Sequence, residues 1–160
     1  MNQMSPFEMQ DTTMENDSIP MTMPPMQYKI MRTGQRPLIF DGTELCMAMN
    51  FIPGAPYWFE INIYRTANQT FVAAVKIFFA DENARDRAKA WEFASFDEVM
   101  ETLESYDAAA DMRVDSFADD ASLSAVELAA LGYSLMARAK AARDQYAGLL
   151  GEILHEVDVH

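Results

Sequence analysis

The sequence predicts an α+β fold in which an antiparallel β-meander of about four or five strands is packed by a short helix and a long C-terminal helix, with a flexible N-terminal arm. Three observations predict it. Apolar and polar residues alternate in several short runs, turn-forming residues separate these runs, and two serine–glutamate pairs each precede a stretch of helical periodicity. The chain has 160 residues, so we expect one domain around one core.

Residues 1–26 differ in composition from the rest of the chain. This segment contains seven methionines and four acidic residues but no basic residue, and few of its side chains are branched or aromatic. Such a composition offers little apolar surface to bury, so we expect a flexible, acidic, methionine-rich arm. The arm is either a plain disordered tail or a segment that docks on a partner through adaptable apolar side chains. In the second case the expected anchors are Phe7, Ile19, Met21 and Met23.

Residues 27–95 are expected to form the sheet of a single domain that spans residues 27–160. Turn signals occur at Gly34, at Asp41-Gly42 and in the Pro-Gly-Ala-Pro segment at 53–56, since glycine accepts positive φ and proline fixes φ. We interpret Asp41-Gly42 as a hairpin turn. The short connections predict antiparallel neighbours, because parallel strands need long crossovers.

Two-residue alternation defines the individual strands. Residues 82–90 fit either a helix or a strand, and we assign a strand to about residues 88–94. The two basic clusters, at 32–36 and 85–89, are interpreted as loop charges. Three runs alternate clearly: Leu45, Met47, Met49 and Phe51; Phe59, Ile61 and Ile63; and Phe71, Ala73, Val75, Ile77 and Phe79.

A short helix is expected at residues 96–106. Ser95 and Glu98 fit a capping box, in which each side chain satisfies a free backbone amide of the first turn. The acidic residues of this helix are expected to face solvent, because its apolar residues recur on one side. Residues 107–123 are predicted to form an acidic loop. The apolar side of the helix consists of Phe96, Val99, Met100, Leu103 and Tyr106.

A long helix is expected at residues 124–157, where Ser124 and Glu127 form a second capping box. Small or apolar residues recur along it in steps of three and four. Such a helix would be about 50 Å long, which exceeds the width of a small domain. It therefore either breaks near Gly132 or Gly148 or projects. Two roles stay open: a helix laid across the sheet, or a homodimer or partner helix.

The formal net charge of −13, from 25 acidic and 12 basic residues, limits the partners of this chain. Nucleic acids and anionic membranes are disfavoured because both carry negative charge. A basic protein surface is favoured, although the same charge can serve solubility alone. No segment has the roughly 18–20 apolar residues needed to span a bilayer, and no signal peptide is recognised, so we expect a cytoplasmic protein.

No motif indicates catalysis, a metal or a cofactor. The single cysteine, Cys46, lies in an apolar run and is expected to be a small buried residue. Glu152 and His155 have the spacing found in carboxylate-bridged metal bundles, but the chain lacks the second pair that such sites need. Phosphate-binding glycine loops and a GxSxG nucleophile elbow are both missing from the sequence. We therefore expect no catalytic, metal or cofactor residues.

These observations favour a non-enzymatic acidic module that binds a basic surface of another protein. In its small size, acidity and lack of motifs the chain is similar to proteins that mimic nucleic acid, such as phage-borne anti-restriction and anti-CRISPR inhibitors. That likeness implies an inhibitor that competes with nucleic acid. The residues expected to bind the partner are Asp97, Glu98, Glu101, Glu104, Asp107, Asp111, Asp115, Asp119 and Asp120.

An alternative function uses the sheet instead of the acidic surface. Trp58, Glu60 and Tyr64 share one face of a predicted strand, and Trp91 lies in another strand. Aromatic side chains beside a carboxylate are typical of small-molecule sites. A small-molecule-binding domain or a small enzyme built on Trp58, Glu60, Tyr64 and Trp91 is therefore the second hypothesis.

Overall fold

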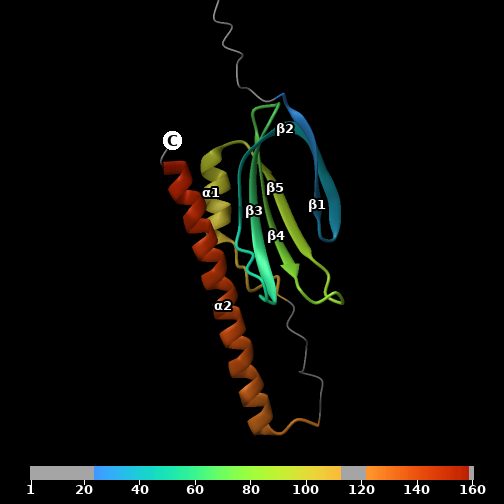
Figure 1. Ribbon diagram of the computed structural model, residues 1–160, viewed down its shortest axis with the longest axis vertical. Coiled ribbons are helices and arrows are strands. Elements are labelled where there is room, and N and C mark those ends of the chain that lie inside the picture. The colour runs from blue at the N-terminus through green and yellow to red at the C-terminus, as the bar shows by residue number, and fades with distance from the viewer. Residues whose placement is uncertain (1–23, 113–121, 159–160) are drawn as a thin grey trace, which may run out of the picture.

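The computed structural model describes residues 24–112 and 122–158 (Figure 1). Within these ranges it confirms the predicted α+β fold. Five antiparallel strands form one sheet in the order β1-β2-β3-β4-β5, followed by two helices. The elements are β1 (Met26–Arg32), β2 (Gln35–Met49), β3 (Tyr57–Thr66), β4 (Phe71–Phe79), β5 (Arg87–Phe93), α1 (Phe96–Ser105) and α2 (Ala125–Asp158).

Both helices lie against one face of the sheet. Tyr146 of α2 packs edge-on against Phe59 at 5.9 Å between ring centroids, and its hydroxyl donates a 2.5 Å hydrogen bond to the carbonyl oxygen of Leu103. That carbonyl lies in the last turn of α1, where no helical partner is available. The core on this side contains Phe59, Ile61, Ile63, Ala73, Val75 and Ile77 from the sheet and Val99, Leu103, Ala142, Tyr146, Leu149 and Ile153 from the helices.

The capping boxes predicted at the starts of both helices are present. At α1, the Ser95 hydroxyl accepts from the Glu98 amide at 3.3 Å and the Glu98 carboxylate accepts from the Ser95 amide at 3.1 Å. At α2, Ser124 and Glu127 exchange equivalent bonds of 2.6 and 3.2 Å. Each box satisfies amides that have no partner within the helix.

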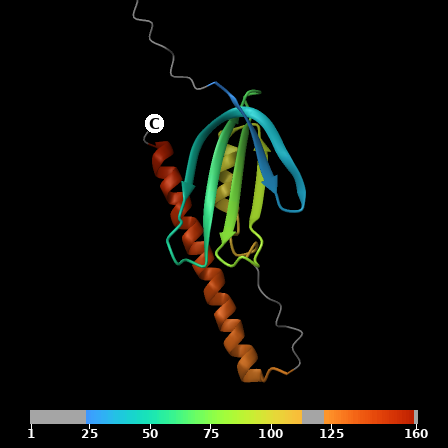
Figure 2. The same cartoon turned by 45° about the vertical axis from the view of Figure 1, so that its right-hand side comes forward.

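The long helix is continuous and projects beyond the sheet. Neither Gly132 nor Gly148 interrupts α2, which runs for 34 residues. Its buried side chains begin at Ala142, so only its second half packs on the domain, while its first half extends past the sheet (Figure 2). Of the two predicted possibilities, a break or a projection, the structure has the projection.

The prediction of a hairpin turn at Asp41-Gly42 is wrong. β2 continues through both residues and changes partner there: residues 35–42 pair with β1, whereas residues 42–49 pair with β3. Gly42 is opposite Thr66, and a Cβ on Gly42 would lie 2.3 Å from the carbonyl oxygen of Arg65. Glycine therefore permits a close approach of two backbones at a corner and does not reverse the chain.

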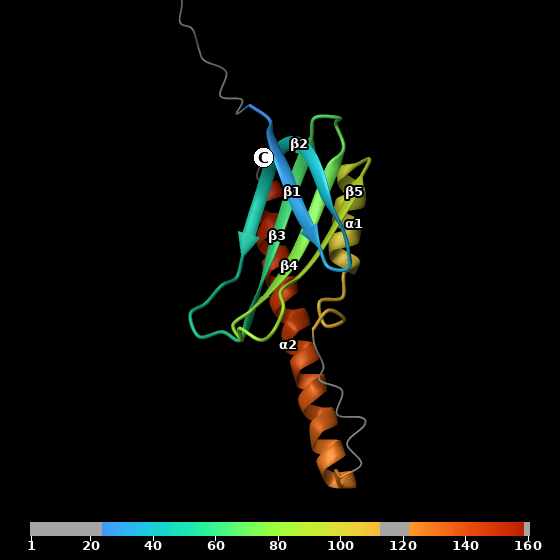
Figure 3. The same ribbon diagram turned by 90° about the vertical axis from the view of Figure 1, so that its right-hand side faces the viewer.

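The sheet curls away from the helices because of this corner. The hairpin of β1 and β2 folds over the other face of the sheet, where Ile30, Tyr64, Val72, Ala74 and Ala90 form a second core (Figure 3). The curl brings the end of β1 to the start of β5. There the Thr33 amide donates to the Ala88 carbonyl at 2.8 Å, and the Ala88 amide donates to the Thr33 hydroxyl at 2.9 Å.

The second half of β2 has an uncovered face. Cys46 and Ala48 pack towards the helix-side core, whereas the alternating residues Leu45, Met47, Met49 and Phe51 are exposed. β1 pairs with β2 only as far as Gly42, and a register shift between Glu44 and Cys46 places Cys46 opposite Ile63, on the helix side of the sheet. The two-residue alternation of this strand therefore indicates a strand without indicating which face is buried.

We expect Gly42→Ala to lower the free energy of unfolding by about 1–3 kcal/mol, because the added methyl group meets the backbone of Arg65. Gly132→Ala is the matched control. No atom lies within 4 Å of a Cβ at that position, so it is expected to raise the free energy by about 0.5–1 kcal/mol. Urea unfolding measures the free energies of unfolding of both variants. Equal values for Gly42→Ala and Gly132→Ala would contradict a close backbone approach at Gly42.

Candidate functional site

The exposed side of α1 carries a row of carboxylates. Asp97, Glu101 and Glu104 are exposed, and their spacing of four and three residues places them on the same side of the helix. In the described part of the chain, no side chain of the three makes a hydrogen bond or ion pair. Glu98 is also exposed, but its carboxylate is engaged in the capping box. The side chains of Asp97, Glu101 and Glu104 are thus available to a partner.

Asp107, which follows α1, has an internal partner. Its carboxylate accepts two hydrogen bonds from the guanidinium of Arg143 in α2, at 2.9 and 3.0 Å, and one from the Ala109 amide at 3.1 Å. The hydrogen bond from Arg143 holds the pKa of Asp107 below its ordinary value. Both side chains are exposed, so the pair is a surface clamp between the loop and α2.

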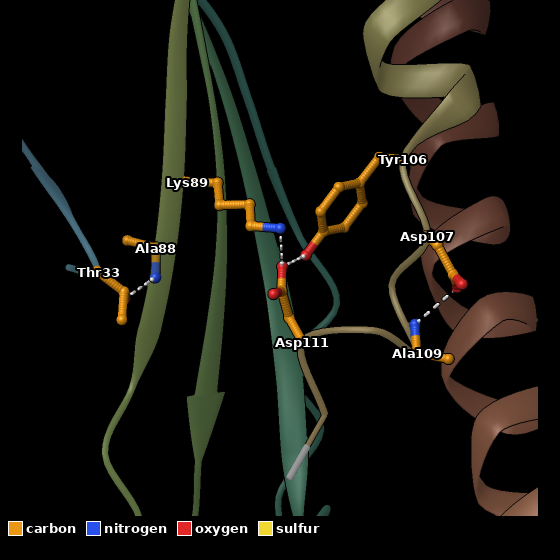
Figure 4. A network of polar contacts seen from close by, with 7 residues as sticks. All are labelled: Thr33, Ala88, Lys89, Tyr106, Asp107, Ala109 and Asp111. Carbon is orange, nitrogen blue, oxygen red and sulfur yellow. Dashed lines mark hydrogen bonds and ion pairs between the residues drawn. The ribbon is translucent and has the colours of Figure 1, made fainter. Parts of the chain in front are cut away.

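Asp111 also serves the structure, through the contacts drawn in Figure 4. Its carboxylate accepts a 2.6 Å hydrogen bond from the Tyr106 hydroxyl and lies 3.1 Å from the Lys89 ammonium of β5. The same ammonium lies 5.6 Å from the centre of the Tyr106 ring. Burial and the bond to Asp111 raise the pKa of Tyr106 well above its ordinary value, which keeps the hydroxyl protonated as a donor.

The structure therefore divides the predicted acidic surface. Asp107 and Asp111 attach the segment after α1 to α2 and β5, and the row on α1 remains exposed. The other predicted residues of the acidic surface, Asp115, Asp119 and Asp120, and the arm anchors Phe7, Ile19, Met21 and Met23 lie outside the described residues. Sequence reasoning did not identify Arg143 as the partner of Asp107 or Lys89 as the partner of Asp111, because these pairings join distant segments.

The four residues of the alternative ligand face do not converge. Trp58 stacks on Phe78 at 5.8 Å and Glu60 pairs with Lys76 at 2.9 Å, on the sheet face that is turned away from the helices. Tyr64 shares that face but is only 3% exposed, packed in the second core. Trp91 is opposite Ala73 in the ladder and packs on Tyr106 on the helix side. The sheet thus separates Trp91 from the other three.

Asn62 is a buried polar residue that the sequence did not single out. Its side chain is 3% exposed, and its amide nitrogen donates to the Glu44 carboxylate at 2.9 Å. Its oxygen Oδ1 has no hydrogen-bond partner among the described residues. Asn62 is opposite Met47 in β2 and Ala74 in β4, on the sheet face turned away from the helices, so this face contains a buried acceptor without a partner among the described residues.

A basic cavity of about 480 Å³ on the same sheet face was not predicted from the sequence. It lies where β1 ends and β5 begins, and its lining residues include Lys29, Arg32, Lys76 and Arg87. The interpretation of the two basic clusters as loop charges is wrong for four of their five basic residues: Arg32 lies within β1, Arg36 within β2, and Arg87 and Lys89 within β5. The curl of the sheet brings Arg32 and Arg87 together, and no local sequence signal marks it.

The remaining chemical candidates form no constellation. Burial raises the pKa of the half-buried Cys46 thiol, and the carboxylates of Glu156 and Glu44 raise it further. Within the described ranges, no group of three or more histidine, cysteine, aspartate or glutamate side chains is arranged to hold a metal ion. Neither described helix has the length and apolar character that crossing a bilayer demands.

The fold and these surfaces define a single-sheet α+β protein with an acidic helix on one side and a basic cavity on the other. Comparison with protein-family models, with curated proteins and with solved structures found no match to the chain. Function is therefore argued from the surfaces alone.

We expect Asp107→Asn to destabilise the protein near pH 7 and to have little effect at low pH. A lowered pKa in the folded state adds stability above the pKa of the unfolded carboxyl, about 3.9, and that stability is lost as the pH falls through the folded value. Urea unfolding of wild type and variant at neutral pH and below about pH 3 measures the difference in their free energies of unfolding, which is expected to be smaller at the lower pH. Glu101→Gln is the exposed control. If it lowers the free energy of unfolding at neutral pH as much as Asp107→Asn does, the pair of Asp107 and Arg143 does not contribute the proposed stability.

Proposed function

We propose that this chain is a non-enzymatic interaction module whose acidic α1 side binds a basic surface of another protein. The observation that carries the proposal is the exposed row of Asp97, Glu101 and Glu104, with no cationic partner among the described residues. Asp107 and Asp111, by contrast, are paired internally. The carboxylates of the row therefore have no ion pair within the described part of the chain that would give them a structural role.

The electrostatics of the row favour a cationic partner. Like charges three and four residues apart repel one another on a helix, so a cationic partner relieves repulsion as it binds. A row of carboxylates also presents negative charge at regular intervals, as a phosphate backbone does. We propose that the partner is a nucleic-acid-binding protein and that the module inhibits it by occupying the same basic surface. We place this activity in the cytoplasm.

We expect the triple variant Asp97→Asn, Glu101→Gln, Glu104→Gln to capture the basic partner at least tenfold less than wild type. Each substitution removes one unit of charge from α1 and leaves the apolar side of the helix unchanged. Immobilised wild type and variants are incubated with extract of the source cells, and bound proteins are quantified by mass spectrometry. Capture of the partner is also expected to fall in about 0.5 M salt, and added DNA or RNA is expected to displace it.

The matched control for this test is Asp41→Asn, Glu82→Gln, Glu152→Gln, which changes the net charge equally at three exposed positions outside α1. It is expected to retain capture. If the control and the α1 variant lose the same proteins to the same extent, net charge alone is responsible and the α1 surface is excluded. If no protein distinguishes wild type from the α1 variant, the proposed function is wrong.

We also propose that the projecting half of α2 pairs with a second copy of the chain. Leu128, Leu131 and Leu135 continue the side of the helix that is buried further along, whereas Tyr133 and Met136, 75% and 70% exposed, lie on the other side. A helix that is apolar all round is normally buried. The half from 125 to 138 carries one acid and one base, so two copies can approach there despite the charge of −13.

We expect the full chain to be a dimer at concentrations of roughly tens of micromolar, measured by light scattering. Val126→Lys and Leu128→Lys together are expected to produce monomers, because they place charges on both sides of the projecting half. Ser134→Lys is the control, since it adds a cation at an exposed polar position of the same half. A monomeric wild type, or a dimer that the double variant leaves intact, would refute pairing through α2.

A further inference from the structure

The basic cavity at the junction of β1, β4 and β5 has the composition of a ligand site. Lys29 and Arg32 come from β1, Lys76 from β4 and Arg87 from β5, so four of the twelve basic residues of the chain line one depression. Its volume of about 480 Å³ falls in the range of small-molecule sites. Ile30, Met31, Phe78 and Ala88 add apolar lining beside these cations.

We propose that this cavity binds a small organic anion, whose phosphate or carboxylate group is held by the cations while an apolar or aromatic portion lies against Met31 and Phe78. A guanidinium offers several fixed donors to such a group, and a lysine ammonium adds a mobile charge. Phe78 is itself held by stacking on Trp58 at 5.8 Å, so the apolar part of the cavity is preorganised.

The charges of the cavity are only partly balanced by the protein. Lys76 pairs with Glu60 at 2.9 Å, and the Asp86 carboxylate accepts from the Phe79 amide at 3.1 Å. Lys29 and Arg87 make no ion pair with any described residue. Among the described residues, four cations and one carboxylate, Asp86, line the cavity, so its charge is predominantly positive and it attracts anions.

The position of the cavity explains how an acidic protein can bind an anion. The carboxylate row lies on α1, against the sheet face opposite the curl, so the sheet and its core separate the two charged surfaces (Figures 1 and 3). Charges separated by more than a Debye length, about 8 Å at physiological ionic strength, are largely screened. The Thr33–Ala88 hydrogen bonds hold β1 against β5 at the cavity.

Titration calorimetry of the full chain tests the proposal with two anions, adenosine monophosphate for phosphate and benzoate for carboxylate. Adenosine without phosphate and inorganic phosphate alone separate the apolar and ionic contributions. At least one of the two organic anions is expected to bind with a Kd below about 1 mM. Adenosine monophosphate is expected to bind more tightly than adenosine or inorganic phosphate alone. Failure of both organic anions to bind at this concentration would overturn the proposal.

Charge-removing variants locate the site. Lys29→Gln with Arg87→Gln is expected to weaken binding at least tenfold, whereas the control, Arg138→Gln with Lys140→Gln on α2, removes the same charge at exposed positions and is expected to bind like wild type. Circular dichroism and thermal unfolding verify the fold. If the double variant unfolds, Lys29→Gln alone, at an exposed position, provides the comparison. Wild-type affinity in the folded cavity variant would overturn the proposal whether or not the α1 surface binds a protein.

Discussion

The change of partner within β2 at Gly42 is the constraint on which the rest of the structure depends. Before this residue β2 pairs with β1, and after it β2 pairs with β3. The backbones of β2 and β3 can approach this closely only because residue 42 is a glycine, since the Arg65 carbonyl oxygen lies where a Cβ would be. As a result the first hairpin folds over the sheet, encloses a second core around Tyr64 and brings β1 to β5. The helices are left to cover only the opposite face.

This arrangement separates the charged groups of the chain by role. Around the end of α1, carboxylates meet cations from distant elements: Arg143 holds Asp107, and Lys89 with Tyr106 holds Asp111. Close by, the Tyr146 hydroxyl satisfies the Leu103 carbonyl, which has no partner within α1. The exposed carboxylates of α1 have no such partners within the described residues, and in the lining of the cavity cations outnumber acids. The net charge of −13 is a sum over the whole chain and does not describe these local differences in charge between surfaces.

Local patterns were sufficient to predict the alternating runs, both capping boxes and the continuous helical periodicity, because alternation and capping depend on neighbours in sequence. The corner at Gly42 was not predictable in the same way, since glycine serves both tight turns and close backbone approaches. The opposed faces of Trp58 and Trp91 follow from the register between strands, which alternation within one strand does not define. Likewise, the clamp of Asp107 on Arg143 joins residues 36 positions apart.

The hydrogen bonds between Thr33 and Ala88 join residues 55 positions apart, whereas the other strand pairings join sequential neighbours. Closing so long a loop costs more chain entropy than forming each hairpin of the meander, so we expect the β1–β5 contact to form last in the sheet. The Thr33–Ala88 contact is held by two hydrogen bonds, so we expect it to open locally while the rest of the sheet stays folded. We therefore expect the amides of Thr33 and Ala88 to exchange through this local opening, and the amides of β3 and β4 to exchange only when the domain unfolds as a whole.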